Sequence, residues 1–484
     1  MNRNRLTVGN RASGVIDKKL NSPLPSFPKG GCGGITHYLC FERCLLFSII
    51  FLLFSFFCLL PPHAFALDVK RSLLPNGLVV LHSESHTLPI VMVTLIVKAG
   101  QLHEAEEKAG TANLVAELLT EGTKNRASKD VSEQIDFIGA SLDASAGADF
   151  TSITLSVLKK DLHKGFEIFT DVLMNPTFPE NEIVRVKDRI KGFLKQQEED
   201  PSFLAGRAFK REVFGNHPYG RLTEGSPATI DMIKREDLIR FHADYFLPNN
   251  SILSVSGDLA PDELTALLTE YLRAWKMRAL PAKSAIVLDD KRMKKVIKID
   301  RDLTQANIVL GHIGISRENP DYYAVSVMNY ILGGGGFSSR LMQSIRDSMG
   351  LAYDVYSFYR PYKESGTFEI GVQTKNESAQ IALDEISKQL ERIRKEHVSD
   401  EELSEAKSYL TGSFSRRLDT NRKIADFLAS VEFYNLGDDY VKKYADYINA
   451  VTKEDVLRVA QKYLDPEQYI LVVVANQKKA VLKK

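Results

Sequence analysis

An α+β fold built from two similar halves is the architecture that the sequence predicts, on three observations. Residues 233–258 align without gaps on residues 451–476, at a constant offset of 218 residues. Each copy has the pattern of a capped amphipathic helix, a proline turn and a final apolar strand. Each half also opens with an apolar strand that is followed by a helical pattern. Helices that cover an antiparallel-type sheet account for this order of elements.

The expected elements follow the same order in both halves. The first half has a strand at residues 90–100, a helix that contains Asn113, a helix at 128–138, strands within 139–158 and a helix at 180–199. The second half has a strand at residues 305–315, a helix at 322–332, strands within 351–374 and a helix at 400–418. A linker that contains proline and alanine, at residues 278–285, separates the two halves.

Composition excludes one class of partner, and the N-terminus indicates export. The 484 residues carry 63 basic and 62 acidic side chains, so no excess of positive charge favours nucleic acid. Residues 44–60 are an uncharged apolar run that precedes Ala64 and Ala66, as in a signal peptide with an A-x-A cleavage site. The alternative is an uncleaved membrane anchor through the same run. All four cysteines precede Ala66, so we expect no disulfide and no thiolate metal site in the mature chain.

We therefore predict an exported, periplasmic protein with four segments, whose only membrane contact is through its N-terminus. The predicted segments are a signal peptide with an extended N-region at residues 1–66, a first domain at 67–277, the linker at 278–285 and a second domain at 286–484.

The helix around Asn113 has the frame of a zinc-binding helix without its zinc chemistry. In the H-x-x-E-H pattern, two histidines at i and i+4 share one helix face and bind a metal, while the glutamate activates the metal-bound water. Here the same frame carries Asn113, Ala116 and Glu117, followed by Gly122-Thr123. An amide oxygen is a poor zinc ligand, alanine accepts no proton, and one carboxylate does not hold zinc alone.

These flanks resemble the insulinase/pitrilysin family of metallopeptidases, peptidase family M16. The resemblance extends over residues 67–480 and implies two homologous α/β-sandwich domains, like those of LuxS-type metallohydrolases, that form half of a clamshell. It places Asn113 and Glu117 at the two metal-histidine positions and Ala116 at the general-base position. Aligned on Phe193-Leu194 within residues 191–201, it places Gln196 at the third ligand position, and a shifted register that uses Glu198 is the alternative. We therefore expect no cofactor in this chain.

The second half carries residues that the resemblance links to catalysis. In the family, an arginine and a tyrosine seven residues later bind the substrate backbone and stabilise the reacting carbonyl. Arg346 and Tyr353 match this pair, with Gly350-Leu351-Ala352 between them. A guanidinium and a phenol can both donate hydrogen bonds to a developing oxyanion. The alternative is a surface ion pair of Arg346 with a neighbouring acid, with Tyr353 packed.

Two further segments are predicted to contact substrate. The glycines Gly333, Gly334, Gly335 and Gly336 allow a backbone path close to other groups. They lack the spacing of a phosphate-binding loop. Residues 148–158 alternate as a strand should, and the resemblance implies an edge strand there to which an extended peptide adds.

The function implied by these residues is that of one subunit of a two-chain M16 peptidase. This chain would supply Arg346 and Tyr353, and a homologous subunit with an intact His-x-x-Glu-His motif would supply zinc. Peptides or unfolded polypeptides would be the substrates, and the chain would be inactive alone. Two alternatives stay open at this point, a catalytically inactive peptide-binding or scaffold protein and an active zinc peptidase with atypical ligands.

Overall fold

The computed structural model describes residues 67–282, 288 and 294–483. Within these residues, no helix is long and apolar enough to cross a membrane. The predicted signal peptide, with its apolar run at residues 44–60, lies outside the described residues, and so does part of the predicted linker. The boundaries proposed for the four segments therefore stay predictions.

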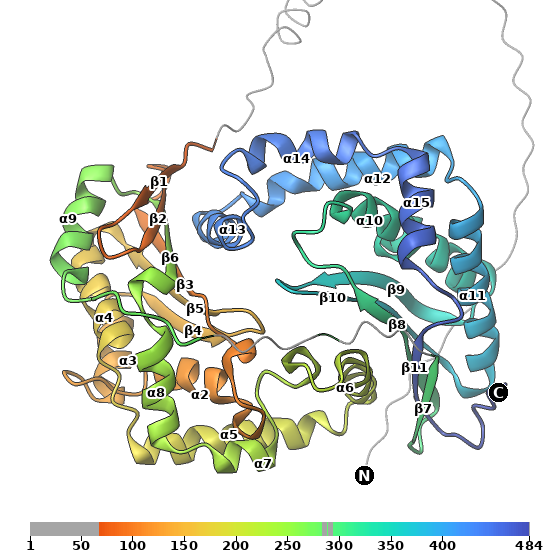
Figure 1. Cartoon of the computed structure of the whole chain (residues 1–484), viewed down its shortest axis with the longest axis horizontal. Helices are drawn as coiled ribbons and strands as arrows, with labels where there is room; N and C mark the ends of the chain where they lie inside the picture. The colour runs from red at the N-terminus through yellow and green to blue at the C-terminus, as the bar shows by residue number, and fades with distance from the viewer. Residues whose placement is uncertain (1–66, 283–287, 289–293, 484) are drawn as a thin grey trace, which may run out of the picture. The chain divides into compact units, whose positions relative to one another are not determined.

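The first half is a mixed sheet covered by helices (Figure 1). Its strands are β1 Lys70–Leu73, β2 Val79–Glu84, β3 Ile90–Val97, β4 Ser141–Ala146, β5 Thr151–Leu158 and β6 Ser251–Gly257. Its helices are α2 Thr111–Leu118, α3 Ser128–Phe137, α4 Leu162–Met174, α5 Glu180–Gln197, α6 Pro201–Phe214, α7 Pro227–Met232, α8 Arg235–Tyr245 and α9 Pro261–Leu272.

The first sheet has the order β1-β2-β6-β3-β5-β4. The β2–β6 pair is parallel and the other pairs are antiparallel. Apolar side chains on one face of the sheet, among them Val93, Leu95 and Leu155, pack against α2, α4 and other helices of this half in one core. Burial of this apolar surface is the main source of the stability of this half.

The second half repeats the plan with fewer strands (Figure 1). Its strands are β7 Lys295–Asp300, β8 Gln305–Gly314, β9 Ala352–Pro361, β10 Gly366–Lys375 and β11 Ile470–Ala475. Its helices are α10 Tyr322–Asn329, the π-helical turns η6 Tyr330–Gly334 and η8 Met342–Ser348, α11 Ala379–Lys395, α12 Asp400–Gly412, α13 Asn421–Phe433, α14 Tyr440–Asn449 and α15 Lys453–Tyr463.

The topology of the second sheet confirms the internal duplication. Its order, β7-β11-β8-β10-β9, matches β2-β6-β3-β5-β4 of the first sheet, including the parallel pair at β7–β11. Helix α15 begins and ends 218 residues after α8, which is the offset read from the sequence. The predicted α+β fold of two similar domains is therefore confirmed.

One helix of each half also packs against the sheet of the other half. Helix α6 belongs to the first half in sequence, yet its Leu204, Phe209 and Val213 form a core with strands β8 and β11 of the second sheet. Helix α13 belongs to the second half, and its Leu428 and Phe433 pack on β2, β3 and β6 of the first sheet. This exchange joins the halves through two apolar cores.

A buried carboxylate adds a polar joint between the halves. Asp149, in the turn between β4 and β5, is 5% exposed. It accepts hydrogen bonds from the hydroxyl of Tyr219, from the backbone N–H of Lys363 at 3.0 Å and from the hydroxyl of Tyr434 at 3.5 Å. His217 fixes the turn that carries Tyr219, because its Nδ1 accepts from the Tyr219 N–H at 3.2 Å. Burial raises the pKa of Asp149, and the Tyr219 hydroxyl opposes this effect.

A second carboxylate yields a prediction on acid stability. Asp321, at the start of α10, accepts from Arg458 at 2.7 Å, Lys462 at 2.9 Å and the Tyr463 hydroxyl at 2.6 Å. Burial raises its pKa, but these three donors outweigh burial and lower the pKa to about 2. A carboxyl group whose pKa is lowered on folding stabilises the folded state at pH values above 3.8, its pKa in the unfolded chain. This stabilisation is lost as the pH falls toward 2. We expect Asp321→Asn to lower the unfolding free energy by about 1–2 kcal/mol at pH 7 and by little at pH 2.

Urea unfolding at a series of pH values measures this difference. Asp136→Asn, an exposed aspartate on α3, is the control and should leave the curve unchanged. A loss for Asp321→Asn that is the same at pH 2 and pH 7 would contradict the assigned role of the carboxylate charge.

Candidate functional site

Helix α2, which carries the predicted zinc-motif positions, is anchored at its N-terminus by a buried glutamate. Both carboxylate oxygens of Glu104 accept backbone hydrogen bonds, from the N–H of Gly110 at 3.0 Å and from that of Ala112 at 2.6 Å. These N–H groups are among those a helix leaves unpaired at its start. Burial raises the pKa of Glu104 to about 7, and the two N–H donors oppose the rise. Sequence reasoning did not single out Glu104.

The motif positions are linked to one another and to a guanidinium. The side-chain amide of Asn113 donates to Glu117 Oε1 at 3.1 Å, one helical turn along α2. The other oxygen of Glu117 is ion-paired with Arg189 of α5. Ala116, at the general-base position, is 1% exposed and belongs to the core. Glu117, the one carboxylate of the motif, is therefore already paired with a cation, the guanidinium of Arg189.

The packing of α2 on α5 shows which residue faces the motif from the neighbouring helix. Glu117 is ion-paired with Arg189, and Glu121, just after the end of α2, is ion-paired with Arg185, one turn earlier in α5, so the two segments run antiparallel. Four residues span about one helical turn, so the same register brings Phe193 level with Asn113. Gln196 lies almost a further turn along α5, and the side chains of both Phe193 and Gln196 are exposed. The geometry therefore favours Phe193, which is not a metal ligand, as the residue opposite Asn113.

These residues do not fit a zinc ion. Asn113, Glu117 and Phe193 provide a single carboxylate, and Arg189 neutralises it. In the described part of the chain, no group of three histidine, cysteine, aspartate or glutamate side chains is placed to hold a metal ion. Zinc in proteins takes three or four nitrogen, sulfur or carboxylate ligands, so we assign no metal chemistry to this helix.

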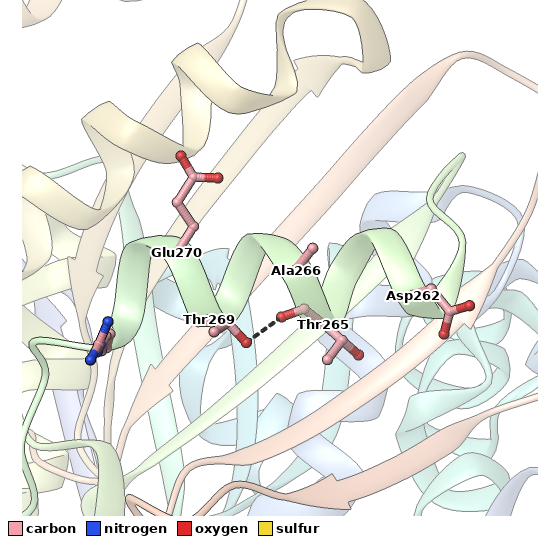
Figure 2. Close-up of a pocket in the computed structure, with 6 residues that line it drawn as sticks. Asp262, Thr265, Ala266, Thr269 and Glu270 are labelled. Atoms are coloured by element: carbon pink, nitrogen blue, oxygen red, sulfur yellow. Dashed lines mark hydrogen bonds between the residues drawn. The ribbon is translucent and has the colours of Figure 1, made fainter.

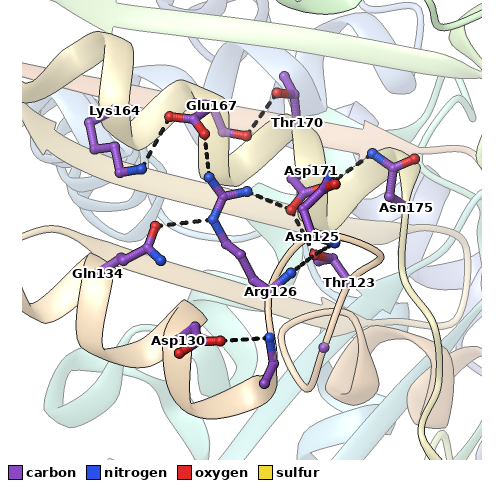
Figure 3. Close-up of polar contacts among 12 residues, drawn as sticks. Thr123, Asn125, Arg126, Asp130, Gln134, Lys164, Glu167, Thr170, Asp171 and Asn175 are labelled. Atoms are coloured by element: carbon purple, nitrogen blue, oxygen red, sulfur yellow. Dashed lines mark hydrogen bonds and ion pairs between the residues drawn. The ribbon is translucent and has the colours of Figure 1, made fainter.

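The loop after α2 is held by a saturated polar network (Figure 3). Asp171 of α4 accepts from the Thr123 hydroxyl, the Asn125 amide and the Arg126 guanidinium, each at 2.6 Å. Arg126 is also ion-paired with Glu167. Because each carboxylate already has partners from the loop, this cluster serves to fix the Gly122-Thr123 segment and offers no open ligand position.

The surroundings of Arg346 and Tyr353, in the second half, differ from the hydrogen-bonded networks around α2. The guanidinium of Arg346 lies 5.2 Å from the centre of the Tyr353 ring and 4.6 Å from that of Phe337. Tyr353 is 85% exposed. Within the described residues the guanidinium makes no hydrogen bond and no ion pair. The structure therefore contains neither the surface ion pair nor the packed tyrosine of the alternative interpretation.

A π-helical turn and a left-handed glycine bring the two residues together. Arg346 lies in η8, a π-helical turn of the kind that is frequent at functional sites. Its carbonyl accepts from the N–H of Gly350 at 3.0 Å, and Gly350 has a φ of 62°. The chain then enters β9, of which Tyr353 is the second residue. A β-carbon at position 350 would disfavour this reversal.

Packing requires three of the four glycines that precede this site. A β-carbon would lie 2.6 Å from the backbone of Ser357 at Gly333, 2.6 Å from the Asn329 side chain at Gly334 and 2.8 Å from a backbone oxygen at Gly335. A β-carbon at Gly336 would meet nothing within 4 Å, and its φ is 60°. Contact of these glycines with substrate stays a prediction, but their close approach to β9, α10 and η6 already explains the residue type at three positions.

The prediction that residues 148–158 form an edge strand is wrong. Strand β5 is paired on both sides, with β3 and with β4. The edge of the first sheet is β4, because the turn at residues 147–150 folds it back against β5. In the second sheet, the edge strand on the corresponding side is β9, which carries Tyr353. On this side of the two sheets the edge strands are therefore β4 and β9, not β5, and the edges on the other side are β1 and β7.

A surface depression along α9 carries no comparable chemistry (Figure 2). Residues of α9 and its C-terminal cap line it, namely Asp262, Thr265, Ala266, Thr269, Glu270 and Arg273. The hydroxyl of Thr269 donates to the Thr265 carbonyl at 2.7 Å, a contact within the helix. None of the predicted site residues lies there, so we do not treat it as the functional site.

Comparison with known proteins supports the assignment of the fold and of the family. Residues 79–226 match the sequence model of the insulinase family, peptidase family M16, and residues 232–410 match that of the peptidase M16 inactive domain. The matches extend over both halves, and this chain belongs to peptidase family M16.

Three similar proteins illustrate the relationship. An uncharacterized zinc protease of Rickettsia bellii (strain RML369-C) is 27% identical over 413 residues, which cover 84% of this chain and 92% of that protein. The non-peptidase homolog YmxG of Helicobacter pylori (strain ATCC 700392 / 26695) is 26% identical over 402 residues, covering 83% and 92%. The crystal structure of a peptidase M16 inactive domain from Pseudomonas fluorescens is 28% identical, with a TM-score of 0.80, and covers 86% of this chain and 100% of that one.

The names of these relatives include both zinc proteases and a non-peptidase homolog. Membership of the family therefore leaves activity open, and the side chains at the site must decide it. Here the zinc-motif positions are occupied by Asn113, Ala116 and Glu117, whereas the arginine and tyrosine of the second half are present.

Proposed function

We propose that this chain is the zinc-free subunit of a two-chain M16 peptidase, to which it contributes Arg346 and Tyr353. The partner is a homologous chain with an intact His-x-x-Glu-His motif, and the substrates are peptides or unfolded polypeptides. The N-terminal sequence supports export, so we place the complex outside the cytoplasm, in the periplasm.

One observation carries this proposal. Arg346 is half-buried, its guanidinium makes no hydrogen bond or ion pair within the described residues, and it lies beside the highly exposed Tyr353. A charged group that is partly desolvated without a partner is costly to the fold. A site that receives a carbonyl or carboxylate oxygen from another molecule accounts for that cost.

The chemistry available to the pair is the donation of hydrogen bonds. The guanidinium presents several N–H donors in one plane, and the phenol presents one O–H. Donors that are already in place before reaction stabilise the negative charge that develops on a carbonyl oxygen during peptide hydrolysis. Neither group activates water, so hydrolysis requires a nucleophile that the partner subunit provides.

The residues on the zinc-motif helix support the proposal that the partner subunit, and not this chain, binds zinc. In this chain the one carboxylate of the motif is ion-paired with Arg189, and Ala116 is buried in the core. This disfavours an active zinc peptidase with atypical ligands. A catalytically inactive peptide-binding or scaffold protein is the remaining alternative, because a bound peptide would also give Arg346 a partner, and cleavage by the reconstituted complex distinguishes the two.

Reconstitution tests the proposal. A zinc-bearing M16 chain from the same organism, this chain and their equimolar mixture are each incubated with quenched fluorescent peptides. We expect hydrolysis by the mixture only, and inhibition of that hydrolysis by a chelator. A complex that forms and binds peptide but never cleaves it would support the scaffold instead.

A further inference from the structure

The segment between α10 and η8 is held rigidly against strand β9. Asn329 clamps the strand from α10, because its amide donates to the Ser357 carbonyl at 3.2 Å and its side-chain oxygen accepts from the Ser357 hydroxyl at 2.9 Å. Gly333 lies so close to Ser357 that a β-carbon would be 2.6 Å from its backbone nitrogen and from its hydroxyl. The chain therefore leaves η6 along a fixed path, and Phe337 follows directly after these glycines.

Phe337 lies at the end of this segment, beside Arg346. Its ring centre is 4.6 Å from the Arg346 guanidinium carbon, closer than the Tyr353 ring at 5.2 Å. Yet the Phe337 side chain is 67% exposed and belongs to none of the hydrophobic cores among the described residues. An exposed phenylalanine contributes little to burial, so its contact with the guanidinium is the main interaction that the structure gives it.

An aromatic ring suits a guanidinium that must keep its donors free. The attraction is between the cation and the face of the ring, so it uses none of the N–H groups. A carboxylate partner would hold the guanidinium equally well, but it would occupy those same donors. Restricting Arg346 before substrate arrives also reduces the side-chain entropy that is lost on binding.

We propose that Phe337 is a positioning residue that orients the Arg346 guanidinium toward the substrate carbonyl. The glycines Gly333–Gly336 then serve to deliver this ring to the arginine. The proposal rests on the proposed function for its effect on catalysis, whereas the orientation of Arg346 can be measured on this chain alone.

The first test is a double-mutant cycle in the two-chain peptidase. Phe337→Ala is expected to lower kcat roughly two- to five-fold with little change in KM, the range for an exposed cation–π contact. Phe337→Tyr, which keeps the ring, should restore kcat. In the Arg346→Ala background, Phe337→Ala should have no further effect. Phe137→Ala, which removes an exposed ring at the end of α3, is the control and should leave kcat unchanged.

Each result of the cycle has a separate meaning. A loss from Phe337→Ala that persists in the Arg346→Ala background, or that appears in KM alone, would overturn the proposal in favour of direct substrate contact. If Arg346→Ala itself leaves kcat unchanged, the proposed function fails.

The second test uses this chain without its partner. Ring currents of Phe337 should displace the Hδ and Hε resonances of Arg346, which are assigned by comparison with Arg346→Lys. We expect this displacement to be lost in Phe337→Ala and kept in Phe337→Tyr. Arg346 resonances that do not change in Phe337→Ala would overturn the positioning role whatever the outcome of the kinetic experiments.

Discussion

Replacing Arg346 with alanine is expected to lower kcat of the two-chain peptidase by ~10²–10³-fold, the usual effect of removing one oxyanion donor. The guanidinium makes no hydrogen bond or ion pair within the described residues, and its ring contacts are with the exposed Phe337 and Tyr353, so its removal should change stability little and leave the zinc content unchanged. Tyr353→Phe keeps the ring beside Arg346 and loses only the hydroxyl, so its effect should be smaller and should fall mainly on kcat.

Steady-state kinetics on a single peptide substrate measures both variants. The control is Arg416→Ala, because Arg416 likewise lies over a tyrosine ring, at 6.0 Å from that of Tyr409, but is exposed. It should behave as the wild type. Normal turnover in a complex that lacks both the Arg346 guanidinium and the Tyr353 hydroxyl would remove the catalytic role assigned to this chain.

The second large effect concerns the joint between the halves. Phe209→Ala is expected to lower the unfolding free energy by about 3–5 kcal/mol, as for other buried phenylalanines. Phe209 is 0% exposed and packs on the second sheet, where a β-carbon at Gly311 would lie 2.9 Å from its ring. The cavity would open between a helix of the first half and a sheet of the second, so cooperativity between the halves should also fall.

Denaturant unfolding followed by two probes checks this result. The signal of Trp275, the single tryptophan, reports on the first half, where it belongs to the core, and far-ultraviolet circular dichroism reports on both halves. We expect the two curves to coincide in the wild type and to separate in Phe209→Ala. Coincident curves with a loss under ~1 kcal/mol would show that α6 is not a structural link between the halves.

The duplicated elements could be predicted from sequence because their signals are local. Helices α8 and α15 each begin with acidic residues in their first turn and end before a proline turn, and both occur where they were expected. The alternation of β5 likewise identified a strand. The neighbours of β5 in the sheet could not be predicted from the sequence, because strand pairing depends on residues far away in the chain. For that reason the edge was assigned to β5 when it belongs to β4.

The exchange of α6 and α13 could not be predicted for the same reason. The apolar face of α6, with Leu204, Phe209 and Val213, predicts a buried helix but does not specify which sheet buries it. At the candidate site, the matched motif identified Arg346 and Tyr353. The contact of Arg346 with Phe337 depends on a π-helical turn, and the pairing of Glu117 with Arg189 depends on how two helices pack. Neither leaves a signal in local periodicity.

The zinc content of this chain, purified alone in its folded state, tests the central claim most directly. The claim is that the catalytic metal belongs to another subunit, because the motif positions hold Asn113, Ala116 and Glu117, with Glu117 ion-paired to Arg189. After equilibration with zinc and removal of excess metal, we expect less than ~0.1 zinc per chain, since one carboxylate does not make a zinc site. One tightly bound zinc per chain would contradict the account.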